Sequence, residues 1–190
     1  MLLAKVFDKL AQAEKDQVIL VLCELIKPIC PDHIRIKVLA ALLGGLQRQS
    51  LVPRKHHTQL LESFKLSLMA EDRTVRNLTC ACMDVLVLLD EFALETLECG
   101  LIDYVYEVLR QSGELKDALD SDCLSWLLNI LYSLSHHLPF KTSLAYGMRT
   151  LLHQMSRVDA LHVGPLLRLL DQCLSFPASE TFEDRDANCY

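Results

Sequence analysis

The chain has 190 residues, of which 51% are hydrophobic and 6% aromatic, and its formal net charge is -6 at pH 7. This length allows one domain with a core of mainly aliphatic side chains. The negative charge argues against general nucleic-acid binding, which needs many Lys and Arg side chains facing phosphates, and six Gly with six Pro favour helices.

Apolar residues recur at helical spacing from Leu2 to Leu174, and no segment shows the alternation of a strand. The pattern predicts an all-α fold of about nine helices. In chain order we expect helices over Leu2–Ala13, Glu14–Lys27, Asp32–Leu43, His57–Met69, Glu71–Leu89, Glu91–Cys99, Leu101–Ser112, Cys123–Leu131 and Leu161–Phe176.

The two ends of the chain are expected to differ. The first helix has an apolar face at Leu3, Val6 and Phe7, and such a face needs a neighbour to cover it. We therefore expect residues 1–176 to form one helical-repeat domain that is a fragment or short isoform of a longer array. Residues 177–190 carry few apolar side chains and four acidic ones, and this composition predicts a disordered acidic tail.

The cysteines indicate the compartment. Five of the eight lie inside apolar helical runs, where a free thiol behaves as a small hydrophobe; these are Cys23, Cys80, Cys82, Cys123 and Cys173. Charge interrupts the N-terminus too early for a secretory signal, and the uncharged run 123–140 holds too many polar groups for a membrane span. We expect reduced core thiols and a cytoplasmic or nuclear protein.

Three segments resemble helical repeats. Gly100-Leu101-Ile102-Asp103-Tyr104-Val105 through Ser112 is similar to the entry of the second armadillo helix, and Cys123-Leu124-Ser125-Trp126-Leu127-Leu128-Asn129-Ile130-Leu131 resembles the third. Asp72-Arg73-Thr74-Val75-Arg76 resembles the start of a HEAT-type helix. A further segment that resembles a helix entry, 163–170, has its glycine, Gly164, 64 residues after Gly100, whereas such repeats run at about 40. The resemblance implies an irregular armadillo/HEAT-like α-solenoid.

Trp126 and Asn129 are the candidate groove residues. In the armadillo resemblance an Asn of the third helix hydrogen-bonds the backbone of a bound peptide, and a Trp one turn earlier forms side-chain pockets. Here the two are three residues apart, whereas the peptide-groove pattern has four. The alternative is that Trp126 packs in the core and Asn129 bonds a neighbouring backbone group.

Charge is distributed in two blocks. No acidic residue lies between Asp32 and Glu62, and no basic residue lies between Arg76 and Arg110. Each block is either solvated surface or a docking site for a partner of opposite charge. The acidic candidates are Asp90, Glu91, Glu95 and Glu98. The basic candidates are Arg48, Arg54 and Lys55, within a block that also contains Arg35 and Lys37.

Catalytic and metal-binding patterns are not evident in the sequence. The adjacent histidine pairs diverge on a helix, and Cys80 and Cys82 are about 200° apart around a helix axis. We therefore predict neither catalytic residues, nor a metal, nor a cofactor. The sequence favours a non-enzymatic scaffold that presents a helical-repeat surface to a protein partner, with a basic segment as the candidate ligand. The alternative is a nucleic-acid- or chromosome-associated repeat protein that uses the basic block near residues 48–55.

Overall fold

The computed structural model describes residues 10–47, 52–114, 121–137, 147, 149–153 and 160–174. Within these residues the chain is helical and contains no strand, which confirms the all-α prediction. The described elements are eight α-helices and one short 3-10 helix: α2 (Gln12–Ile26), α3 (Asp32–Leu46), η1 (Arg54–His56), α4 (His57–Leu68), α5 (Arg73–Leu86), α6 (Asp90–Glu98), α7 (Leu101–Glu114), α8 (Ser121–Leu134) and α10 (Ala160–Leu174).

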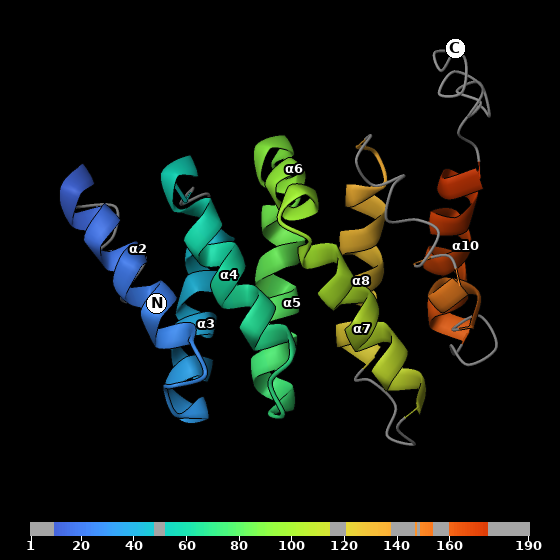
Figure 1. The fold of residues 1–190 in the computed structure, drawn as a ribbon, viewed down its shortest axis with the longest axis horizontal. Coiled ribbons are helices and arrows are strands. Elements are labelled where there is room, and N and C mark those ends of the chain that lie inside the picture. The colour runs from blue at the N-terminus through green and yellow to red at the C-terminus, as the bar shows by residue number, and fades with distance from the viewer. Residues whose placement is uncertain are drawn as a thin grey trace, which may run out of the picture.

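The helices stand side by side in two layers along the long axis of the molecule (Figure 1). One layer contains α3, α5, α8 and α10 in this order, and each packs against the next. The other contains α2, α4 and α7, while α6 lies near one end of α4, α7 and α8. Chain neighbours such as α2 and α3, or α4 and α5, run in opposite directions, so helices within a layer run in the same direction (Figure 1).

The core lies between the two layers and is built mainly from aliphatic side chains. Leu39, Leu60 and Leu131 are fully buried or nearly so, and the largest buried rings are Phe64, Phe92 and Tyr106. Each such side chain contributes about 1.5–3 kcal/mol on burial. The five cysteines predicted to be core thiols are all buried and unbridged, as expected.

Arg35 is a buried residue that links the two helices of the first hairpin, α2 and α3. Its side chain is 4% exposed and donates hydrogen bonds to the Ile26 carbonyl (Nε, 2.8 Å), the Asp32 carboxylate (Nη1, 2.8 Å) and the Ser67 hydroxyl (Nη2, 3.3 Å). Ile26 is the last residue of α2, where the carbonyls lack helical partners and the helix dipole favours a cation. The basic block of the sequence therefore does not expose Arg35, which joins α2, α3 and α4.

The second hairpin, formed by α4 and α5, also has an acid and an arginine at the start of its second helix. Asp72 caps α5 by accepting a hydrogen bond from the Val75 amide at 3.0 Å. Arg76 reaches back to the end of the preceding helix, where its Nη1 donates to the carbonyls of Ala70 (2.6 Å) and Glu71 (3.3 Å). In both hairpins an acid stands at the start of the second helix, and an arginine of that helix donates to carbonyls at or just after the end of the first.

The largest differences from the predicted boundaries are three residues, at the ends of α3, α5 and α8. The helix expected to end near Leu43 continues through Gly44 and Gly45 to Leu46, whose side chain is buried, because tertiary packing outweighs the low helix propensity of glycine. The helix expected over Glu71–Leu89 is shorter at both ends, since Asp72 caps its start and the chain turns before α6.

Some predictions fall outside the described residues. These are the first helix before Leu10 and the acidic tail 177–190. Within the described part of the chain, no helix combines the length and the apolarity required to cross a bilayer.

Candidate protein-binding surface

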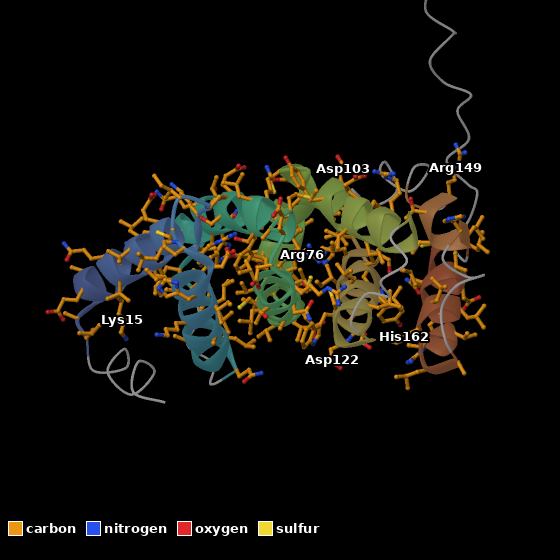
Figure 2. All side chains as sticks on the ribbon, turned by 90° about the horizontal axis from the view of Figure 1, so that it is seen from below. Lys15, Arg76, Asp103, Asp122, Arg149 and His162 are labelled. Atoms are coloured by element: carbon orange, nitrogen blue, oxygen red, sulfur yellow. The ribbon has the colours of Figure 1, made fainter. Side chains whose placement is uncertain are left out.

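The outer face of the α3, α5 and α8 layer carries the candidate groove residues. Asp122, Trp126 and Asn129 follow one another along α8 at helical spacing and share one side of this helix. Asp122 and Asn129 are exposed, while Trp126 is half-buried and packs against the core. Figure 2 shows Asp122 on the outer side of α8 and Asp103 on the opposite face of the molecule. One part of the Trp126 side chain thus packs against the core, and the other part is exposed on the outer face.

Asp84 joins this surface from the neighbouring helix. The thiols of Cys80 on α5 and Cys123 on α8 are 3.8 Å apart, so these two positions face each other across the seam between the helices. Asp84 lies one turn after Cys80, and Trp126 lies about one turn after Cys123 on a helix that runs in the same direction. Asp84 and Trp126 therefore flank the same stretch of the seam.

The environment of Asp84 is unusual for a carboxylate. Its side chain is half-buried, and burial raises the pKa of Asp84 above its ordinary value. Among the described residues no ion pair or hydrogen bond compensates the buried charge. The sequence places Asp84 in the acidic block but cannot show this, because the partial burial arises from the packing of α5 against α8.

The acidic candidates lie on α6. Asp90, Glu91 and Glu98 are exposed, and Glu95 is half-buried. Arg54 of η1 lies against two of them, with Nε 3.3 Å from Glu95 Oε1 and Nη1 3.7 Å from Glu91 Oε1. The structure therefore pairs Arg54, one of the basic candidates, with Glu91 and Glu95, two of the acidic candidates.

Lys55, the other basic candidate that the structure describes, also lies against a carboxylate. Lys55 pairs with Asp16 of α2, whose other oxygen is 3.0 Å from His56 Nε2. His57 Nδ1 lies 3.5 Å from Glu95 Oε2, within ion-pair range but without hydrogen-bond geometry. Arg48 lies outside the described residues. The exposed pair of Arg54 with Glu91 contributes about 0–1 kcal/mol, so it orients η1 against α6 more than it stabilises the fold.

One serine and one histidine meet between α8 and α10. The Ser125 hydroxyl is 3.1 Å from His162 Nε2, and His162 is 1% exposed (Figure 2). A buried polar side chain needs such a partner, and this contact supplies one where two helices pack. In the part of the chain that the structure describes, no group of three or more His, Cys, Asp or Glu side chains could hold a metal ion.

An apolar groove lies near the N-terminal end of the described helices, and the sequence did not point to it. An open groove of about 610 Å³ runs between α2 and α3, lined by Val18, Val21, Leu25, Val38 and Ala41 and flanked by Glu14 and Lys37. The signal available in sequence was the nearly all-round apolar character of α2, which indicates burial but not which face stays open.

Comparisons of the chain with protein-family models, with curated proteins and with solved structures gave no match.

Proposed function

We propose that this chain is a non-enzymatic scaffold of irregular armadillo- and HEAT-like helical repeats that holds a segment of a partner protein. Two features of the fold support the repeat interpretation. Each hairpin places one helix in each layer, and in two successive hairpins an arginine near the start of the second helix, Arg35 or Arg76, donates to carbonyls at or just after the end of the first. Such an array offers an extended face suited to a protein chain.

The observation that carries the proposal is the combination of Asp84, Trp126 and Asn129 on one outer face. Asp84 is a half-buried carboxylate without a compensating partner among the described residues. The half-buried indole of Trp126 offers an aromatic surface that attracts cations, and the exposed amide of Asn129 can donate and accept hydrogen bonds. These groups suit a partner segment that places a lysine or arginine side chain at the seam and its backbone near Asn129.

The nucleic-acid alternative has less support. Phosphate binding depends on Lys and Arg side chains that are available to the backbone of the nucleic acid. Arg54 faces Glu91 and Glu95, and Lys55 faces Asp16, so phosphate would compete with carboxylates already in place. The exposed carboxylates of Asp90 and Glu98 offer a basic protein segment a second, weaker contact. The unbridged core thiols support a reducing cytoplasmic or nuclear environment.

Tryptophan fluorescence tests the proposed site directly, because Trp126 is the only tryptophan in the sequence. We expect a capped five-residue peptide with a central arginine to change Trp126 emission with a millimolar dissociation constant. The same peptide with citrulline, which keeps the shape of arginine without its charge, should bind at least about tenfold more weakly, as should the arginine peptide with Asp84→Asn protein.

Asp103→Asn is the matched control, since Asp103 is exposed on the opposite face and its loss should leave the titration unchanged. Equal responses to the arginine and citrulline peptides, or a response that survives Asp84→Asn, would contradict the proposed site.

Asp84→Asn should also make the folded protein more stable at neutral pH, by roughly 0.5 kcal/mol for a half-exposed group. The pKa of Asp84 is higher in the folded than in the unfolded chain. The free energy of unfolding therefore falls as pH rises through the range in which Asp84 loses its proton. Asp122, the acidic residue of the facing helix α8, is present in both the wild-type protein and the variant, so its titration is common to both. Urea unfolding should therefore show a gain at pH 7 that disappears near pH 3, where Asp84 is protonated in both states. A loss of stability at pH 7 would mean that Asp84 has a favourable partner.

A further inference from the structure

Cys80 and Cys123 form a buried thiol pair beneath the outer face. Their sulfur atoms are 3.8 Å apart, and neither side chain is exposed. They belong to neighbouring helices, α5 and α8, and are 43 positions apart in sequence. Among the described residues this is the one contact between two thiols; Cys82, two residues further along α5, directs its sulfur to the Leu39 carbonyl of α3 at 3.6 Å.

We propose that Cys80 and Cys123 are a reversible oxidation site, which a hydroperoxide converts into a disulfide that links α5 to α8. This inference is independent of the proposed function. It concerns the same seam, however, because Asp84 and Trp126 lie about one turn beyond the two cysteines.

The packing geometry favours the bond. A disulfide needs a sulfur–sulfur distance of about 2.05 Å and Cβ atoms about 3.5–4.5 Å apart. Here both side chains point into the same seam and their sulfurs are 3.8 Å apart, so rotation of the two side chains has to close a gap of about 1.8 Å. Cys82 has no such partner, since its side chain points to the opposite neighbour of α5.

The chemistry balances with hydrogen peroxide as oxidant. One thiol loses its proton, and the thiolate attacks a peroxide oxygen, which breaks the O–O bond and leaves a sulfenic acid and, after proton uptake, water. The second thiol then attacks the sulfenic sulfur, the S–S bond forms, the S–O bond breaks, and a second water leaves. In sum, two sulfurs lose two electrons, and one peroxide is reduced to two waters.

Burial sets the rate of this reaction. The hydrogen bond with Cys123 and the burial of its thiol raise the pKa of Cys80 well above its usual range, so the reactive thiolate is scarce in the closed structure. Oxidation therefore requires local opening of the α5–α8 seam. The same burial protects the finished disulfide from reductants, so the oxidised state should be slow to form and persistent once formed.

The test uses the full chain exposed to hydrogen peroxide, followed by unfolding, alkylation of the remaining thiols, and trypsin. Cys80 and Cys123 fall in separate tryptic peptides, 77–110 and 117–141. We expect the cross-link between these peptides to exceed any other disulfide at least tenfold, and to revert with dithiothreitol after unfolding. Amide exchange in α5 and α8 should slow at least tenfold in the oxidised protein.

Cys82→Ala is the matched control, because peptide 77–110 also contains Cys82 and Cys99. The cross-link should persist in Cys82→Ala and disappear in Cys80→Ala. The wild-type peptide map does not depend on the folding of either variant. The proposal is overturned if wild-type protein yields sulfinic acids or no oxidation in place of the cross-link, or if the cross-link survives Cys80→Ala.

Discussion

Replacing Arg35 with methionine is expected to lower the free energy of unfolding by about 2–4 kcal/mol, since three hydrogen bonds from a charged donor are lost together and each such bond contributes about 1.5–3 kcal/mol. Methionine preserves much of the side-chain volume but provides no donor. The Ile26 carbonyl at the end of α2 would then keep only the longer hydrogen bond from the Ser67 hydroxyl, at 3.3 Å, and this hydroxyl would lose its link to α3. Urea unfolding followed by circular dichroism at 222 nm measures the change.

Lys37→Met is the matched control on the same helix. Lys37 is exposed and lies half a turn from Arg35, so the same substitution there should change stability by less than about 0.5 kcal/mol. Arg35→Lys should recover only part of the loss, because an ammonium group cannot reproduce the fork that reaches the Ile26 carbonyl, the Asp32 carboxylate and Ser67 together. Equal losses for Arg35→Met and Lys37→Met would show that the three hydrogen bonds contribute little.

Gly147→Ala should have the second largest effect, a loss of about 1–3 kcal/mol through overpacking. A Cβ atom at position 147 would lie 2.0 Å from Cζ of Tyr106, whose ring is fully buried on α7, so either the ring or the backbone at position 147 has to shift within the core. This clash outweighs the gain of up to about 1 kcal/mol that alanine brings to a helical position. Thermal and urea unfolding both report the loss.

Gly44→Ala provides the control for this experiment. Gly44 lies in α3, and a Cβ atom added there would meet no neighbouring segment within 4 Å, so alanine should leave stability unchanged or raise it by up to about 1 kcal/mol. Shortening the facing ring with Tyr106→Leu should make Gly147→Ala less harmful than it is in the wild-type background. If the two glycine substitutions had the same effect, position 147 would have room for a side chain.

Local patterns were enough to predict the helices and part of the candidate site. The apolar period predicted α4 and α6 to within one or two residues, and it identified the buried cysteines. The spacing of Trp126 and Asn129 also placed both on one side of α8, which depends only on the 3.6-residue turn. Their proposed role as a binding surface remains a prediction.

Contacts between distant segments could not be predicted in this way. The basic and acidic blocks were treated as separate surfaces, whereas Arg54 meets Glu91 and Glu95 across about forty residues of chain. Cys80 was compared with Cys82, its neighbour in sequence, although its partner in space is Cys123. A single sequence contains the residue types of such pairs but not their pairing.

By itself the sequence determined the fold class, the approximate extent of each described helix and the aliphatic nature of the core, because these follow from periodicity, composition and capping along a short stretch of chain. Only the tertiary structure decided that Arg35 is buried, that Asp84 lies across a seam from Trp126, and that two thiols touch. The physical reason is that burial, pKa and reactivity depend on which helices pack together and at what register. For a row of similar amphipathic helices, many registers satisfy the same pattern of apolar residues.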